Sequence, residues 1–307
     1  MATPIPFNKT FAPAYGVLEE VGPLIRRMVA QNPGPFTFTG SGTYVIGRGT
    51  VGIIDPGPAI KDHVAALVEA LRGETISHVF VTHTHRDHSG GVAELVRLTG
   101  APTYGFGPHG SGRARAVEGM AEVALEEGAD YDFTPDVRLA PGERVSGPRW
   151  TLEAVHTPGH CSNHLCYALV EAGALFTGDH VMGWSTTVVA PPDGDMRAYM
   201  TSLAKLLLRR ETVYYPTHGA PITDPKPFVA ALIEHRDDRE AQILAELKAG
   251  PACIRDMVPR IYADVPEFLY PAAGLSVLAH LIDLVERGLV TCDGAPRHDS
   301  LFALDSS

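Results

Sequence analysis

Four side chains able to bind a metal ion lie within residues 82–91, whose sequence is THTHRDHSGG. They are His83, His85, Asp87 and His88. Imidazole nitrogens and carboxylate oxygens are suitable ligands for zinc, and also for iron or manganese. A short strand is predicted over 78–82, so side chains 83 and 85 share one side of its end, and the following turn directs 87 and 88 to an adjacent point. The spacing therefore indicates chemistry at two metal centres.

The elements that must position this segment alternate between strands and helices. Before it, the runs FTFTG, TYVIG and TVGII within residues 36–54 are predicted strands, and residues 61–72 carry apolar side chains at the spacing of an amphipathic helix. After it, strands are expected over 150–155, 165–170, 174–177 and 212–215, with a helix over 195–210. Residues 105–147 are less periodic, with a possible helix over 114–127, and suggest a lid or a substrate-facing insertion. This alternation is typical of a layered α/β domain.

One pattern occurs twice along the chain. A strand ending in an aspartate, then a helix, then a strand ending in Thr-His is found as GIIDPG with VFVTH and again as LFTGDH with YYPTH. If two such halves face each other, Asp55, His83, Asp179 and His218 meet at one sheet edge.

The chain changes character at residues 224–227, where two prolines suggest a linker. We therefore divide it into domains 1–225 and 226–307. The second domain is predicted to contain helices over 228–249, 254–262 and 275–287 and a two-stranded wing, a winged-helix-like pattern. It carries 8 Lys and Arg residues against 13 Asp and Glu residues, which argues against sequence-specific DNA binding. We expect it to pack on the first domain, and a homodimer contact is the alternative.

The composition of the 307-residue chain sets further limits. Its net charge of −11 argues against a general nucleic-acid or membrane binder. The longest apolar run, residues 272–290, is interrupted by His280, Asp283 and Glu286 and is too polar to be expected to span a bilayer. Four cysteines without a CxxC pair, and an N-terminal segment without a signal pattern, predict a cytoplasmic protein.

The HTHRDH run resembles the HxHxDH motif of the metallo-β-lactamase fold superfamily. Further motifs of that superfamily follow in its order: Asp55 after a strand, His160 in HTPGH, Asp179 in TGDH and His218 in PTHG. The resemblance covers residues 36–220. It implies an αββα sandwich followed by the winged-helix-like domain.

The same resemblance implies a role for each matching residue. His83, His85 and His160 would bind one metal ion, Asp87, His88 and His218 a second, and Asp179 would bridge both. Asp55 would orient ligands through hydrogen bonds, although a purely turn-forming role is open. The implied cofactors are two divalent ions, with zinc favoured and iron or manganese as alternatives. Such a pair would hold a bridging hydroxide able to attack a carbonyl carbon or a phosphorus, and Asp87 would orient the nucleophile or accept its proton.

Two differences from relatives in the superfamily disfavour particular activities. β-Lactamases of this fold place another residue, such as Cys, where Asp179 stands, which disfavours antibiotic hydrolysis. Flavodiiron oxygen reductases carry Glu in place of His85, which disfavours redox chemistry at iron. The run TGDHVMGWSTTVV, the PTHG motif and the later HRDDRE helix are similar to the β-lactamase-like protein 2 family of hydrolases. That resemblance includes enzymes that cut single-stranded RNA and fungal enzymes that release acyl groups from a carrier protein.

We therefore expect a metal-dependent hydrolase that cleaves an ester or thioester of a small-molecule or acyl substrate, because the chain is acidic. A single-stranded RNA endonuclease is the alternative, and it would need a basic groove built from Arg86, Arg113, Arg115 and Arg197. A non-catalytic regulatory binding protein is a third hypothesis. Expected substrate contacts are His164, Ser185, Thr186 and Thr187. For His164 the alternative is a hydrogen-bonded supporting or loop role, and Cys161 is not expected to be a ligand.

Overall fold

The computed structural model describes residues 3–113 and 128–305. Its first sheet has seven strands in chain order: β1 (Glu19–Gly22), β2 (Ile25–Val29), β3 (Gly42–Arg48), β4 (Thr50–Ile54), β5 (Thr75–Phe80), β6 (Thr103–Gly105) and β7 (Val137–Arg138). The strands up to β4 pair antiparallel and those from β4 onward pair parallel. Helices α1 (Lys61–Ala70) and α3 (Val92–Thr99) bury Val64, Leu67 and Leu95 in a core with this sheet.

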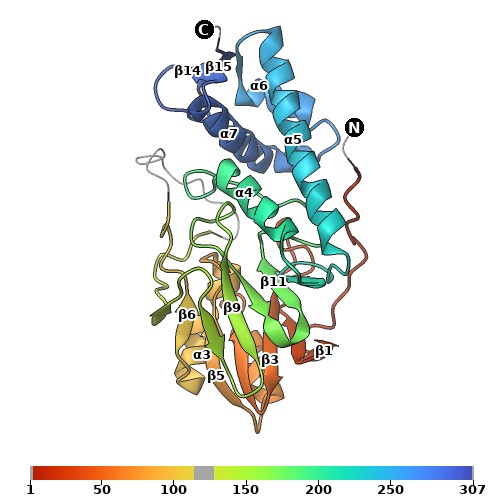
Figure 1. Cartoon of the computed structure of the whole chain (residues 1–307), viewed down its shortest axis with the longest axis vertical. Coiled ribbons are helices and arrows are strands. Elements are labelled where there is room, and N and C mark those ends of the chain that lie inside the picture. Colours follow the sequence, from red (N-terminus) through yellow and green to blue (C-terminus); the bar gives the residue numbers. More distant parts are fainter. Residues whose placement is uncertain (1–2, 114–127, 306–307) are drawn as a thin grey trace.

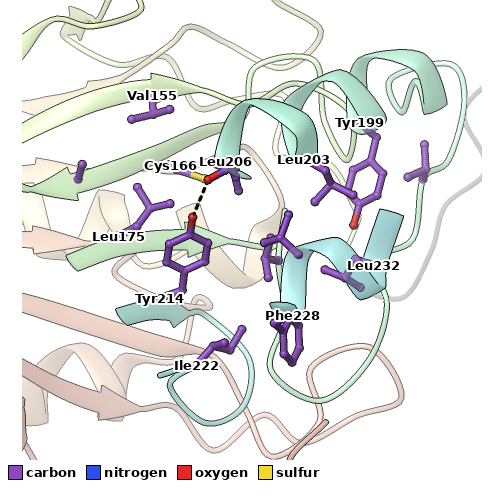
Figure 2. Close-up of a cluster of buried hydrophobic side chains, with 14 of the residues drawn as sticks. Val155, Cys166, Leu175, Tyr199, Leu203, Leu206, Tyr214, Ile222, Phe228 and Leu232 are labelled. Carbon is purple, nitrogen blue, oxygen red and sulfur yellow. Dashed lines mark hydrogen bonds between the residues drawn. The ribbon is translucent and has the colours of Figure 1, made fainter. Parts of the chain in front are cut away.

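The second sheet has five strands, in the order β12 (Val213–Pro216), β11 (Ala174–Gly178), β10 (Leu165–Leu169), β9 (Thr151–His156) and β8 (Arg144–Ser146). A short 3-10 turn over Val170–Ala172 joins β10 to β11. Helix α4 (Met196–Leu207) connects β11 to β12, and its first turn is capped by the Asp195 side chain, which accepts the Ala198 N–H at 2.8 Å. Figure 2 shows the apolar face of α4 against this sheet, where the Tyr214 hydroxyl donates to the Leu206 carbonyl at 3.3 Å.

The two sheets face each other across an aromatic core. Tyr44 and Phe80 from the first sheet pack with Tyr167 and Phe176 from the second, and all four are almost fully buried. The two tyrosines also bond across the layers: the Tyr167 hydroxyl donates to the Val81 carbonyl at 2.9 Å, and the Tyr44 hydroxyl donates to the Pro216 carbonyl at 2.6 Å. With helices on both outer faces, the layers form the expected αββα sandwich (Figure 1).

In each sheet, one pair of parallel strands is followed at its carboxyl ends by an aspartate and a histidine. Asp55 and His83 follow β4 and β5, which pair in parallel, and Asp179 and His218 follow β11 and β12, which do the same. The Gly42 N–H donates to the Thr217 carbonyl at 2.9 Å and so joins the two ends. The repeated pattern in the sequence therefore corresponds to two facing strand pairs.

The C-terminal domain consists of three helices and a small sheet. They are α5 (Pro225–Ala249), α6 (Ile254–Ile261) and α7 (Tyr270–Glu286, preceded by a 3-10 turn over Glu267–Leu269), with β13 (Ala252–Cys253), β15 (Leu301–Leu304) and β14 (Val290–Cys292) in sheet order. Helix α5 serves two cores. Phe228 and Leu232 near its start pack with α4, while Ile243 and Leu247 near its end pack with α6 and α7. Figure 1 shows α5 running from beside α4 to beside α6.

Two local expectations were wrong. Residues 36–40 form turns rather than a strand, with Phe38 at φ 56° and Gly40 at φ 128°. The prolines at 225 and 227 do not form a linker but lie in the first turn of α5, where no intrahelical N–H donor is required. The hairpin of β1 and β2 had not been expected. The possible helix over 114–127 lies outside the described residues.

Residues Glu267–Glu286 are long and apolar enough to cross a membrane, with a mean hydropathy of 1.6. Most of this stretch is buried inside the molecule, where Val277, Leu281 and Leu284 pack in the C-terminal core. Burial against protein accounts for its apolar composition.

His280 on α7 makes folding sensitive to acid. It is buried, and neither ring nitrogen has a hydrogen-bond partner among residues 3–113 and 128–305. Burial, reinforced by the nearby Arg236, lowers its pKa to about 3. The unfolded chain therefore takes up a proton at this histidine below about pH 6.5, whereas the folded chain does not until about pH 3, so stability falls with pH across that window.

We predict that His280→Leu reduces this loss. Between pH 7 and pH 5 the free energy of unfolding of the wild type should fall by up to about 2 kcal/mol through this residue alone. Urea unfolding of both proteins at the two pH values measures the difference. An equal loss in the variant would contradict the assignment.

Candidate metal centre

Asp55 organises the edge at which the strand pairs meet. It ends β4 with φ 51°, a left-handed conformation that is unusual for a residue with a side chain. Its carboxylate accepts the Thr82 N–H and the Thr82 hydroxyl, both at 2.8 Å, and lies 2.8 Å from His88 Nδ1. The Thr217 hydroxyl from the other sheet donates to it at 3.3 Å. Asp55 is therefore much more than a turn residue, because its carboxylate fixes His88.

His83, His85 and His160 bring three nitrogens together. His85 Nδ1 lies 3.0 Å from His83 Nε2 and 3.0 Å from His160 Nε2. Nitrogens bound at about 2.0–2.1 Å to one tetrahedral zinc ion are separated by a similar distance. All three side chains are buried or nearly so. This group has the donor set of one metal site.

Asp87, His88 and His218 form a second group beside the first. Asp87 Oδ2 lies 3.2 Å from His88 Nε2 and 3.1 Å from His218 Nε2. Helix α2 (Arg86–Ser89) supplies the first two residues, and the end of β12 supplies the third. The Ser41 hydroxyl donates to Asp87 Oδ2 at 3.0 Å and restricts its rotation.

Asp179 lies between the two groups. Its Oδ1 atom is 3.3 Å from His218 Nε2 and 3.5 Å from His88 Nε2, while Oδ2 is 3.8 Å from His160 Nε2. One carboxylate thus faces both sets of nitrogens. The seven residues expected from the sequence are brought together in the arrangement that the resemblance implied.

Each imidazole is held by its other ring nitrogen. The partners are Thr82 Oγ1 for His83 at 3.0 Å, Cys161 Sγ for His85 at 3.5 Å, Asp55 for His88, the Val188 carbonyl for His160 at 2.7 Å and the Gly40 carbonyl for His218 at 3.2 Å. Carbonyl partners require the Nδ1 atoms of His160 and His218 to donate, which leaves their Nε2 lone pairs for the site. Cys161 Sγ contacts the outer nitrogen of His85, and it belongs with His83, His85 and His160 to one group of possible donor atoms.

The residues fit divalent metal ions. His88 Nε2 and Asp179 Oδ1 are buried and have no hydrogen-bond partner in the described ranges, although both point into the cluster. Leaving such atoms unpaired costs free energy unless an ion binds them. The mixture of five imidazoles and two carboxylates is suited to zinc, iron or manganese.

The two groups differ in their protonation. Burial lowers the pKa of His83, His85 and His160, in the case of His85 to about 3, so these imidazoles are neutral near pH 7. Burial also acts to lower the pKa of His218, but Asp179 and Asp87 outweigh it and raise this pKa to about 10. The same balance raises the pKa of His88. Protons therefore compete with a metal ion for the second group.

A cleft of about 770 Å³ opens onto the cluster between the two domains. His85, Asp87, His160, Asp179 and His218 lie in its lining. Further lining residues come from the N-terminal segment and from the C-terminal domain, including Arg239 on α5 and Leu269 before α7. Residues of both domains thus line the cleft.

Ser185 and Thr186 line this cleft, whereas His164 does not lie among the described lining residues. His164 is fully buried, bonds to the Thr157 hydroxyl at 2.9 Å and accepts the Asp179 N–H at 3.3 Å. The expectation that His164 contacts substrate was wrong. Its position beneath Asp179 makes it a support for that residue.

Among the described arginines proposed for a basic groove, Arg113 and Arg197 line a second, smaller pocket, and none of the three described arginines lines the cleft at the cluster. Arg113 pairs with Asp193 at 3.2 Å, and Arg197 pairs with Asp283 at 2.6 Å. Arg86 donates to the Ala129 carbonyl at 3.2 Å, and Arg115 lies outside the described residues. The side chains of the three described arginines thus each bond to a nearby carboxylate or carbonyl.

Two further residues of the site had not been expected: Ser41 holds Asp87, and Trp184 lies in the cleft wall stacked on Phe38. Thr187, which was expected as a substrate contact, lines the cleft and also bonds to the Asp179 carbonyl at 2.6 Å. Ser41 follows an irregular turn, and its sequence neighbours give no sign of its partner.

Comparison with known proteins agrees with this geometry. Residues 37–218 match the family model of the metallo-beta-lactamase superfamily, and residues 253–297 match the beta-lactamase associated winged helix domain. A lactamase-like protein of Aspergillus niger is 30% identical over 99% of this chain and 97% of its own length. An atrochrysone carboxyl ACP thioesterase of Paecilomyces divaricatus is 36% identical over 75% of this chain and 66% of its own length.

Solved structures share the whole architecture. A beta-lactamase domain protein from Burkholderia ambifaria superposes with a TM-score of 0.78 at 22% identity, covering 96% of this chain and 95% of that one. A metallo-beta-lactamase family protein from Thermus thermophilus gives 0.73 at 23% identity, covering 92% and 98%. Family match, donor cluster and fold agree: this chain is a hydrolase of the metallo-β-lactamase superfamily with a C-terminal winged-helix domain.

Proposed function

We propose that this enzyme hydrolyses thioesters of apolar acyl groups with the help of two divalent metal ions, for which zinc is the favoured identity. The observation that carries the proposal is the cleft, whose walls near the cluster are largely apolar. Phe36, Phe38, Met182 and Trp184 line it, with Phe38 and Trp184 stacked at 4.8 Å between ring centroids. Such walls suit an aromatic or aliphatic acyl chain rather than a polyanion.

The names of the relatives support the same substrate class. Several relatives that are 30–36% identical to this chain are described as atrochrysone carboxyl ACP thioesterases. Those enzymes are named for releasing an acyl group from a carrier protein. An acyl thioester is accordingly the substrate class that we assign to this chain, and the pairing of Arg113 and Arg197 with carboxylates gives the RNA alternative no support.

In this proposal His83, His85 and His160 hold one ion, Asp87, His88 and His218 hold the other, and Asp179 contacts both. Bound divalent ions would supply Lewis-acid polarisation of the carbonyl and would lower the pKa of water toward neutrality. Asp179, supported from below by His164 and Thr187, keeps the two groups of ligands at a fixed separation.

Asp87 orients the attacking water in this scheme. Burial acts to raise the pKa of this carboxyl, but His88 and His218 outweigh burial and lower it, so Asp87 is ionised at every working pH. A carboxylate that binds protons so weakly is a poor general base, but it stays ionised and can accept a hydrogen bond from water. The Ser41 hydroxyl fixes the carboxylate plane.

The substrate class can be tested with two probes on one preparation. We expect the wild type to hydrolyse an aromatic acyl N-acetylcysteamine thioester and to leave a fluorescent single-stranded RNA intact. Asp87→Asn retains the shape of the side chain but loses its charge, and it should lower kcat/KM by about 10²–10⁴-fold. Circular dichroism controls for folding. RNA cleavage without thioester hydrolysis would show the substrate assignment to be wrong.

The protonation of the two groups leads to a second prediction. Because His218 and His88 carry protons before a metal ion binds, binding at their group should release protons at pH 7, whereas binding to His83, His85 and His160 should release almost none. Affinity for the second group should rise about tenfold per pH unit for each proton displaced, up to about pH 10.

Calorimetric titration of chelator-treated protein with Zn²⁺, in buffers of different ionisation enthalpy, counts these protons. Two binding events with unequal proton release are the expected result. Equal release in both events would contradict the assignment of charge to the second group.

A further inference from the structure

The HRDDRE motif on α5 contains a buried arginine that the hydrolytic chemistry does not use. Arg236 is only 2% exposed, although it belongs to a helix that continues into the C-terminal domain. Its Nη2 atom donates to the Thr187 carbonyl, and its guanidinium lies 5.3 Å from the centre of the Tyr199 ring. Arg236 therefore connects α5 to the segment that follows Asp179.

Thr187 and its neighbour support two of the proposed metal ligands. The Thr187 hydroxyl donates to the Asp179 carbonyl at 2.6 Å and to the His180 carbonyl at 3.1 Å. The next carbonyl, that of Val188, lies 2.7 Å from His160 Nδ1. One short stretch of backbone thus restrains the bridging aspartate and a histidine of the first group.

The choice of arginine at this place has a physical explanation. Burying a guanidinium is costly, and an apolar side chain of similar size would pack on Tyr199 without that cost. Only a donor, however, can satisfy the Thr187 carbonyl, which would otherwise be buried without a partner. The planar guanidinium can donate to this carbonyl while it faces the aromatic ring.

We propose that Arg236 is a positioning residue: by holding Thr187 and Val188 it sets the positions of Asp179 and His160, so that α5 makes the geometry of the metal centre depend on the C-terminal domain. The inference rests on the metal-binding role assigned to these residues above. The HRDDRE motif would thus contribute Arg236 as a support of the metal centre.

The test uses Arg236→Met, which retains the bulk of the side chain but removes the donor, and Thr187→Val, which removes only the hydroxyl. Arg197→Met is the matched control. Arg197 also crosses between the domains, where its Nε donates to Asp283 on α7 at 2.6 Å, but its described contacts do not include residues 187–188.

Two measurements separate positioning from general stability. One is metal affinity from competition with a chromogenic chelator, and the other is the visible absorption of the Co²⁺-loaded protein, which reports ligand geometry. Arg236→Met and Thr187→Val should each weaken metal affinity by about 10–100-fold and alter the Co²⁺ spectrum. Because both substitutions act through one segment, the metal affinity of the double variant should be little lower than that of the single variant with the lower affinity. Arg197→Met should lower the melting temperature only.

Unchanged affinity and an unchanged Co²⁺ spectrum in Arg236→Met would overturn the proposal. If Arg236→Met does not fold, Thr187→Val is the deciding variant, since valine matches threonine in shape. Wild-type metal affinity in Thr187→Val would then contradict the proposal. A wild type that binds no metal ion would instead refute the proposed function. A wild type that binds metal and hydrolyses thioesters, with unaffected variants, would refute only the role of Arg236.

Discussion

The carboxylate of Asp55 is the interaction on which the rest of the site depends. It receives hydrogen bonds from the end of β5 and from Thr217 at the end of β12, and it also contacts the imidazole of His88. One anion thereby joins both sheets and the ligand-bearing turn. Its left-handed backbone costs about 1–2 kcal/mol, a strain that these charge-assisted bonds can offset. Together with the backbone bond from Gly42 to Thr217, this junction joins the two parallel strand pairs at their carboxyl ends.

Around that junction the five histidines of the cluster form a neutral group and a cationic group. On one side three imidazoles lie where burial keeps them neutral, and on the other two imidazoles lie against carboxylates that favour the cationic form. The carboxylates of Asp87 and Asp179 thus lie beside cationic imidazoles even before any metal ion binds, although Asp179 Oδ1 has no hydrogen-bond partner in the described ranges. This arrangement limits the cost of burying two anions in the folded chain.

The ligand set and the layered fold could be predicted because their signals are local. The spacing of His83, His85, Asp87 and His88 on a strand end and turn depends only on nearby backbone geometry, and each parallel strand pair has its own helix between the strands. The contacts of Ser41 and Arg236 could not be predicted, since their partners lie 46 and 49 residues away. His164 was misassigned because its spacing from His160 did not show that its side chain turns inward. The start of α5 was misread because proline is tolerated in the first turn of a helix.

Helix α5 belongs to two hydrophobic cores, with Phe228 and Leu232 in that of the sandwich and Ile243 and Leu247 in that of the winged helix. The structural boundary between the modules therefore falls inside a continuous helix rather than in a loop. The winged-helix match begins only at residue 253, beyond this shared helix. In the evolution of such enzymes, the C-terminal module could be replaced by recombination within or after the second half of α5, but a crossover at its first turn would separate the sandwich from part of its own core.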